Sequence, residues 1–382
     1  MTTQKTTSAA KKAAATVEPG ITGKVPIYAC DFGYGVTKAY SGYGNPFGIR
    51  SLVGDAVSIK YKTSAAEPVR DINRLSVQTN DSGVIKQFFL GELARRQSAT
   101  IYHIVDREKL EYSSTKALIE SSIALMLGPE HENNDKPVDI RIVTGLPVSY
   151  YNDVQIKRLE ATLMGHHDVG FDFNFDGEYE ARYKYNVVGI KILPQPVGTF
   201  YNMILDDTGN FRKDQDAFVS GNIGIIDIGY GTTDLCVLRQ LEYIQKSSRS
   251  IETAVSSVYD MVATKLSDHC GIDVQPYEVE GKLSEGMETG EYTIKIEGNL
   301  YDLGKYYKHA LEKTFEKLLS FTKSTWKSEY QIDKYILTGG GAMLFGAMFK
   351  DSFDTSSLIV PPEAMYSNVI GYRKFGERVF KD

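Results

Sequence analysis

A seven-residue segment occurs twice in this chain, and the repeat constrains the fold more than any other feature. Residues 31–37 read DFGYGVT and residues 227–233 read DIGYGTT, so five of seven positions are identical at a separation of 196 residues. Apolar residues precede each copy and a strand-like stretch follows it, which predicts a strand, a glycine-rich turn and a second strand. Two unrelated hairpins are the alternative, but turn chemistry does not require the Asp and Thr to recur in register. We therefore infer a duplicated domain, with two copies that face one ligand.

The repeated residues suit a phosphate-bearing ligand and a metal ion. Two glycines separated by one residue let backbone N–H groups approach an anion. The two carboxylates, Asp31 and Asp227, would repel phosphates unless a hard divalent cation lay between them, and Mg²⁺ keeps much of its water in such sites. We therefore expect Asp31 and Asp227 to bind Mg²⁺ mainly through water. The expected phosphate contacts are Gly33, Tyr34, Gly35, Thr37, Lys38, Gly229, Tyr230, Gly231, Thr232 and Thr233.

A third glycine-rich turn follows a buried-type strand near the end of the sequence. Residues 335–344 read YILTGGGAML, which predicts a strand, three glycines and the start of a helix. Backbone at a triple glycine can lie against a planar ring and donate N–H groups at a helix N-terminus. We expect this turn to contact adenosine through Gly339, Gly340, Gly341 and Ala342. Glu278 and Lys282 are candidates for ribose contacts on an expected helix, and a solvated charged face is the alternative for both.

Taken together, these motifs resemble the actin/Hsp70/sugar-kinase superfamily. The bridge at residues 143–148, VTGLPV, belongs to the same resemblance. Within the superfamily, residues 31–35 with Lys38, and residues 89–94, FLGELA, are similar to bacterial and archaeal actin-like proteins, above all the plasmid-segregation actins of ParM type. The resemblance covers roughly residues 25–380. It implies an α/β actin-like fold, with two duplicated ribonuclease-H-like domains around a nucleotide cleft.

The resemblance also implies a function. A ParM-like chain would bind and hydrolyse ATP, with GTP as a possible substitute, together with Mg²⁺. It would form cytoplasmic filaments that segregate plasmid DNA through a DNA-bound adaptor protein. Two alternatives stay open: a small-molecule phosphotransferase of the sugar or acetate kinase type, and a nucleotide-dependent scaffold that does not hydrolyse. A phosphotransferase would need a second-substrate pocket, for which the first half of the sequence offers no convincing acid or base.

Gln195 and Asp227 are the expected catalytic residues. Gln195 stands where the ParM pattern has a Glu and where actin has a Gln. A glutamine can orient water but cannot accept its proton at neutral pH, so the sequence predicts slow hydrolysis that is controlled by geometry. Asp227 is expected to orient the attacking water as well.

The domain boundaries follow from the motifs and the apolar periodicity. Residues 1–24 hold four lysines and one acid, and read as a disordered basic tail. Domain I is expected over residues 25–196, with a small insertion subdomain near 50–100 and a C-terminal segment, 363–382, that returns to it. Domain II is expected over 197–362, with a small subdomain near 268–302. Helices are expected at 113–127, 152–163, 251–266 and 303–318, and a buried strand at 139–144.

The composition limits the classes of protein to which this chain can belong. The net charge of −6 and the pI near 5.7 argue against a protein that coats DNA, so direct sequence-specific DNA binding is not expected. No apolar run approaches the roughly 18–20 residues of a membrane span, and no signal-peptide core follows Met1. The cysteines Cys30, Cys236 and Cys270 lack metal-site spacing. A reducing cytoplasm is the expected location.

Overall fold

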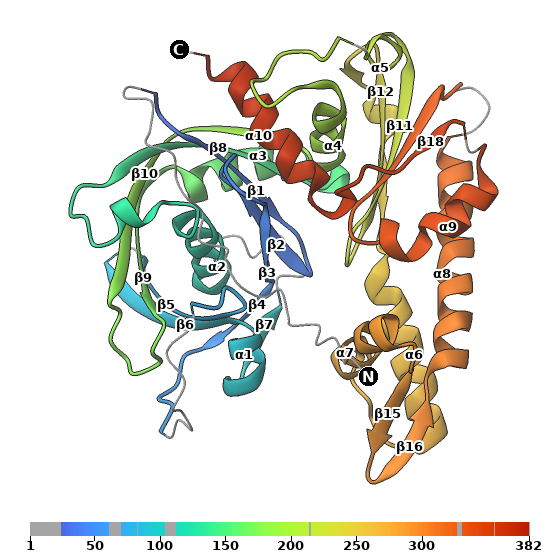
Figure 1. The fold of residues 1–382 in the computed structure, drawn as a ribbon, viewed down its shortest axis with the longest axis horizontal. Helices are drawn as coiled ribbons and strands as arrows, with labels where there is room; N and C mark the ends of the chain where they lie inside the picture. Colours follow the sequence, from blue (N-terminus) through green and yellow to red (C-terminus); the bar gives the residue numbers. More distant parts are fainter. Residues whose placement is uncertain are drawn as a thin grey trace, which may run out of the picture.

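Two β-sheets organise the protein (Figure 1). The computed structural model describes residues 24–60, 70–81, 83–103, 112–213, 215–326, 331–354 and 356–381. The expected tail therefore lies outside the described residues, except for Lys24. Lys24 forms an ion pair with Glu377 near the C-terminus, with 2.7 Å between Nζ and Oε2.

The first sheet has ten strands in the order β3-β2-β1-β8-β10-β9-β5-β6-β4-β7. It curls around the helix α2, and its strands in the expected insertion join through β9 instead of forming a sheet of their own (Figure 1). The strands are β1 Ile27–Phe32, β2 Val36–Tyr40, β3 Phe47–Arg50, β4 Leu52–Asp55, β5 Arg74–Asp81, β6 Val84–Gly91, β7 Ile101–His103, β8 Val138–Leu146, β9 Gly165–Asp172 and β10 Ala181–Pro194. The helices are α1 Glu92–Gln97, α2 Ser113–Ala124 and α3 Asp153–Leu163.

The second sheet has the order β13-β12-β11-β17-β18, and β14 also pairs with β12. Its strands are β11 Asn222–Ile228, β12 Thr233–Arg239, β13 Glu242–Tyr243, β14 Arg249–Ile251, β17 Lys334–Thr338 and β18 Leu358–Ile359. Its helices are α5 Asp216–Ser220, α6 Val255–Cys270, α8 Gly304–Thr325 and α9 Ala342–Ser352. Helix α7, Pro276–Thr289, and the hairpin of β15 Thr293–Ile296 and β16 Asn299–Asp302 lie beyond this sheet, beside α6 and α8 (Figure 1). Short 3₁₀ helices span Pro129–His131, Val148–Tyr150, Gln245–Ser247 and Ala364–Tyr366.

The topology confirms the duplication. In the first sheet β1 pairs antiparallel with β2 and parallel with β8; in the second, β11 pairs antiparallel with β12 and parallel with β17. The register is also repeated: Asp31 lies opposite Lys38, and Asp227 lies opposite Asp234. Asp234 is therefore the structural counterpart of Lys38, so the two copies differ by a reversal of charge at this position.

Two helices connect the sheets. Helix α4, Gln195–Ile204, follows β10, and α10, Ser367–Val379, crosses it while packing on β1 and β8 (Figure 1). The crossing is a backbone contact, because a Cβ added at Gly371 would clash with the carbonyl of Gly198. Glycine is needed here for close approach.

The expected secondary structure is largely confirmed, with shifts at the ends. The helix expected at 113–127 ends at Ala124, and the one expected at 251–266 begins only at Val255, because Ile251 pairs with Thr233 as part of β14. The helix expected at 303–318 continues to Thr325. Among the described residues, no helix combines the length and hydropathy needed to cross a bilayer.

Candidate functional site

A cavity of about 410 Å³ lies between the two sheets, where both repeated turns meet. Its volume falls in the range of small-molecule sites. One group of lining residues belongs to the two turns or is bonded to them, and we call it the polar end: Asp31, Gly33, Tyr34, Gly35, Val36, Lys38, Gln195, Asp227, Gly229, Tyr230, Thr232, Asp234 and Asn368. The other group comes from α6, α7, the triple-glycine turn, α9 and the segment before α10, and we call it the apolar end: Val255, Tyr259, Ser284, Met287, Gly340, Met343, Leu344 and Met365.

The two turns interlock through their tyrosines. A Cβ added at Gly35 would lie 2.5 Å from the ring of Tyr230, and one added at Gly231 would lie 3.2 Å from the ring of Tyr34. Each tyrosine thus packs against a glycine of the other turn. The two repeated segments therefore contact each other in the structure, and the tyrosine of each segment contacts a glycine of the other.

In the first turn, Asp31 is held by two donors. Lys38 Nζ lies 3.1 Å from Asp31 Oδ2, and Gln195 Nε2 donates to Asp31 Oδ1 at 2.8 Å. Burial acts to lower the pKa of Lys38, but the charges of Asp31 and Asp227 outweigh it and raise that pKa. Gln195 is itself buried, at the first position of α4. Its backbone carbonyl accepts a hydrogen bond from the Tyr372 hydroxyl at 3.1 Å. The expected catalytic glutamine is thus held at the polar end of the cavity.

In the second turn, Asp227 is a buried carboxylate with one short donor. Asn368 Nδ2 donates to Asp227 Oδ2 at 2.7 Å, and Asn368 Oδ1 accepts from the backbone and hydroxyl of Thr199. Burial raises the pKa of Asp227 to about 7, against the opposing effects of Asn368 and Lys38. The negative charge of Asp227 is thus only partly compensated by the protein.

Asp234 connects the second turn to the first half of the chain. Its Oδ1 accepts from the N–H of Val148 at 2.9 Å and from the Ser250 hydroxyl, and its Oδ2 accepts from Thr232 Oγ1 at 3.3 Å. Val148 follows β8 of the first sheet. Asp234 therefore lines the cavity and also joins the second sheet to the segment that follows β8 of the first.

In the expected triple-glycine turn, one of the three glycines faces the cavity. Gly339, at φ +82°, and Gly341 both press against the end of β11, and their N–H groups donate to Ala364 and Ile228. Gly340 has no atom within 4 Å of a built Cβ and lines the cavity. Ala342 begins α9 and is buried. Of the three glycines, only Gly340 faces the cavity, because packing occupies the other two.

Four other expected residues have their side chains engaged elsewhere. Thr37 and Thr233 are buried, and their hydroxyls bond to Ser51 and to the carbonyl of Thr253. Glu278 accepts from the N–H of Gln275 at 2.9 Å, and Lys282 forms an exposed pair with Glu285. None of the four lines the cavity. From α7, which carries Glu278 and Lys282, the lining residues are Ser284 and Met287.

A charged contact spans the two halves of the molecule beside the interlocked turns. Arg50, at the end of β3, lies 2.8 Å from Glu280 of α7, and the Tyr230 hydroxyl donates to the same carboxylate oxygen at 3.1 Å. Burial and the Glu280 carboxylate raise the pKa of Tyr230. The contact fixes Tyr230 in the position that covers Gly35.

Sequence reasoning did not find Asn368 or the methionines of the apolar end. Asn368 lies on the C-terminal helix, about 140 residues from Asp227, with which it forms a hydrogen bond. Met287 and Met343 are exposed, and no repeat or spacing distinguishes them. Their only signal is spatial, because helices distant in sequence converge on one cavity.

The donor set at the polar end fits a hard cation. Asp31, Asp227 and Asp234 offer carboxylate oxygens, with Lys38 as the one lining cation among the described residues. Oxygen donors without cysteine or histidine suit Mg²⁺. The raised pKa of Asp227 is the expected sign of a buried carboxylate whose negative charge is only partly neutralised.

Two family models match the chain. The model described as "Actin like proteins N terminal domain" matches residues 29–198, and "Archaeal actin homologue MreB-like, C-terminal" matches residues 225–351. Between them they take in most of the chain, including both repeated turns. No curated protein sequence matches at a significant level.

Solved structures share the fold. A ParM from a 15-stranded filament of Clostridium botulinum is 22% identical, with a TM-score of 0.75 over 93% of this chain and 99% of that one. The apo psk41 ParM is 22% identical, with a TM-score of 0.66 over 92% and 97% of the two chains. An archaeal actin homologue in complex with ADP is 20% identical, with a TM-score of 0.70 over 93% and 100%. With its duplicated turns and the two matching family models, the chain belongs to the actin-like ATPase superfamily and has the two-domain actin-like fold.

Proposed function

We propose that this protein is a polymerising ATPase that binds ATP with Mg²⁺ in the cavity between its two sheets. The single observation that carries the proposal is the pair of interlocked turns, with buried Asp31 and Asp227 at one end of the cavity and an apolar pocket at the other. Phosphates would lie at the turns, and the base would lie among Tyr259, Met287 and Met343.

The residues of the turns would share the work of hydrolysis. Lys38 and the backbones of both turns would hold the phosphates, and Asp31 and Asp227 would hold Mg²⁺ mainly through water. Mg²⁺ supplies positive charge that stabilises the charge on the phosphates. Gln195 bonds to Asp31 through its amide nitrogen, which leaves its side-chain oxygen to accept from the attacking water. Since a glutamine takes no proton, hydrolysis should be slow.

The base pocket should discriminate weakly between ATP and GTP. Its polar features are the side-chain hydroxyls of Ser284 and Tyr259 and the backbone at Gly340, beside apolar and methionine side chains. Strong discrimination requires buried polar groups that the wrong base leaves unpaired. We propose that both nucleotides bind, with a difference in affinity of less than about tenfold.

Polymerisation is proposed from the shared fold with ParM structures, one of which is a filament. We propose that the filaments form in the cytoplasm and segregate plasmid DNA through a DNA-bound adaptor. Domain I, at 25–196 and 363–382, and domain II, at 197–362, would be the two rigid parts that close around the nucleotide.

The test compares the natural chain with Asp227→Asn. Phosphate release and light scattering are measured with ATP, GTP and no nucleotide, in the presence of Mg²⁺. We expect the natural protein to hydrolyse and scatter, and Asp227→Asn to lose most hydrolysis. Asp351→Asn, an exposed carboxylate on α9, is the matched control and should behave as the natural protein.

Three outcomes would contradict the proposal. Unchanged turnover in Asp227→Asn would remove the assigned role of that carboxylate. ATP turnover that depends on an added small-molecule acceptor, without any scattering, would favour a phosphotransferase. Nucleotide-dependent scattering without phosphate release would favour a scaffold that does not hydrolyse.

A further inference from the structure

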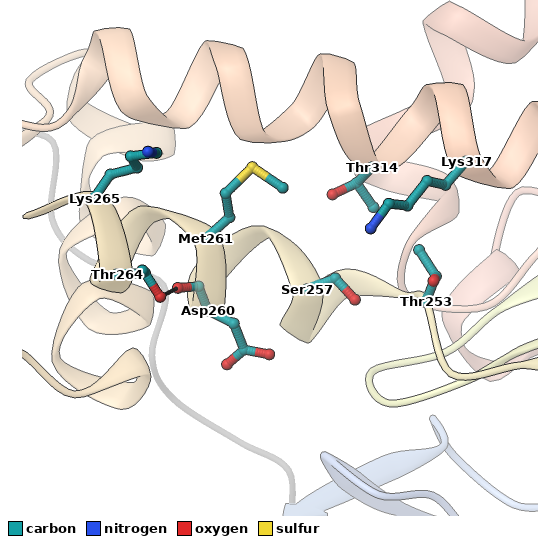
Figure 2. A pocket seen from close by; sticks show the side chains of 8 residues that line it. All are labelled: Thr253, Ser257, Asp260, Met261, Thr264, Lys265, Thr314 and Lys317. Carbon is teal, nitrogen blue, oxygen red and sulfur yellow. Dashed lines mark hydrogen bonds between the residues drawn. The ribbon is translucent and has the colours of Figure 1, made fainter.

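A second cavity, of about 330 Å³, opens between α6 and α8. Figure 2 shows the side chains of both helices that line it. Its lining contains four hydroxyl side chains, two lysines, one methionine and one carboxylate. None of these residues lines the cavity between the sheets. The α6–α8 groove is therefore a separate feature, rich in hydrogen-bond donors.

Thr314 carries the strongest evidence for a ligand. Its side chain is fully buried at the groove, and its hydroxyl has no hydrogen-bond partner within the described part of the chain. A buried hydroxyl without a partner is unfavourable, and most are paired. Lys317 lies beside Thr314 in Figure 2 and is exposed. Since exposed side chains change rotamer within nanoseconds, the ammonium group of Lys317 can turn toward a ligand that lies beside Thr314.

The two lysines of the groove have no acidic partner among the described residues. One turn earlier on α8, Lys313 pairs with Glu316 at 2.8 Å, whereas Lys317 forms no ion pair there and Lys265 forms none either. Lysine binds phosphate as a point charge, and its hydrogen bonds to anionic oxygens are charge-assisted. Two ammonium groups without an acidic partner, beside hydroxyl donors, therefore suit an anionic ligand such as a phosphoryl group.

Asp260 is the one carboxylate in the lining. It is exposed, and Figure 2 shows its carboxylate turned away from α8. Partial desolvation raises the pKa of Asp260, and no cation offsets the effect. The negative charge therefore lies at the outer side of the groove, apart from Thr314 and Lys317.

We propose that the α6–α8 groove binds a small anion with a phosphoryl group. Lys317 supplies the charge, and Thr314 supplies a hydroxyl donor at the floor. Ser257 and Thr253 line the same part of the groove in Figure 2 and add further donors.

The groove is also connected to the second turn. The N–H groups of Val255 and Ser256, at the start of α6, donate to the carbonyls of Gly229 and Tyr230 at 3.3 and 2.8 Å. The carbonyl of Thr253 accepts from Thr233 Oγ1 at 2.7 Å. An anion that shifts the start of α6 would thus move the turn directly, so that binding in the groove would change nucleotide affinity. This coupling, unlike the binding itself, rests on the proposed function.

The experiment measures binding of inorganic phosphate and of pyrophosphate to nucleotide-free protein by calorimetry. We expect Lys317→Ala to weaken binding at least tenfold, and Lys313→Ala, with the same charge change on the same helix, to leave it unchanged. Asp260→Asn should tighten binding, because it removes a repelling charge. Thr314→Val should weaken binding and raise the melting temperature of the free protein, because it removes the unpartnered hydroxyl.

The remaining arms separate the groove from the cavity between the sheets. Lys38→Ala would remove phosphate binding there and should spare the groove. Equal losses in Lys317→Ala and Lys313→Ala, or a loss confined to Lys38→Ala, would overturn the proposal. A loss in Lys265→Ala for pyrophosphate alone would support a ligand with two anionic groups, and equal binding of both probes would support a single phosphoryl group.

Discussion

The ring of Tyr230 lies against Gly35 so closely that a Cβ at Gly35 would come within 2.5 Å of it. The contact joins the two repeated turns, and it needs a glycine because no side chain fits in the space. Tyr230 is in turn held by Glu280, which also pairs with Arg50.

We therefore expect Gly35→Ala to separate the turns and to weaken ATP binding by at least about tenfold, or about 1.4 kcal/mol. The fold should survive, because the clash is local. Binding of a fluorescent ATP analogue and circular dichroism together check this. Gly281→Ala is the control: no atom lies within 4 Å of a Cβ built there, and alanine in a helix should slightly stabilise it. Equal affinity in both variants would show that the contact plays no part in binding.

Asn368→Ala should destabilise the protein by about 1–3 kcal/mol, because it leaves Asp227 and the N–H of Thr199 buried without their partner. Urea denaturation measures the loss. Asn186→Ala breaks an exposed Asn–Asp hydrogen bond of 2.9 Å and should cost less than about 0.5 kcal/mol. Similar losses of stability in the two variants would mean that the buried Asn368–Asp227 hydrogen bond contributes no more than the exposed one.

Gly371→Ala should be the more damaging of two substitutions on α10. Its methyl group would strike the backbone carbonyl of Gly198, which cannot turn aside, whereas the methyl of Gly376→Ala would meet Ile27 Cγ2 at 2.6 Å, the end of a side chain. We expect a loss of more than about 3 kcal/mol for the first and about 1–3 kcal/mol for the second. Thermal unfolding of both variants decides the order, and a reversed order would refute the rigid crossing.

Glu377 should contribute stability that depends on pH. Burial acts to raise its pKa, but Lys24 and Arg373 outweigh this, so the folded pKa is lowered. A lowered acid pKa gives stability that is fully present above the unfolded pKa, about 4.3, and is lost as pH falls through the folded pKa. Glu377→Gln should therefore be less stable than the natural protein at pH 7, with a gap that narrows below about pH 4. Denaturation curves across pH check this, and a constant gap would exclude the charge as the cause.

The sequence predicted the parts of the site that lie within one short segment. The strand, turn and strand around Asp31 and Asp227 are local patterns, so their place in the structure followed from glycine positions and apolar runs. The pairing of Tyr34 with Gly231, and of Asn368 with Asp227, joins residues more than 100 positions apart. No local pattern contains such contacts, because they arise only when two sheets meet.

The predictions for Glu278 and Lys282 show a second limit of reasoning from local sequence. The sequence predicts that these two residues contact ribose because they are charged residues on a helix expected in the same region of the fold. The helix exists as α7, but its rotation turns Ser284 and Met287 to the cavity and leaves Lys282 paired with Glu285. Whether either residue contacts a bound nucleotide stays a prediction. Rotation about a helix axis is set by packing, which charge alone does not reveal.

The crossing of α4 and α10 has a mechanical consequence. With no side chain between Gly198 and Gly371, the two backbones bear directly on each other, so the crossing resists sliding but permits a small change of angle. If the two halves of the molecule rotate about this crossing, residues far from it move most. The Arg50–Glu280 ion pair joins the two halves, so its length would measure such a rotation.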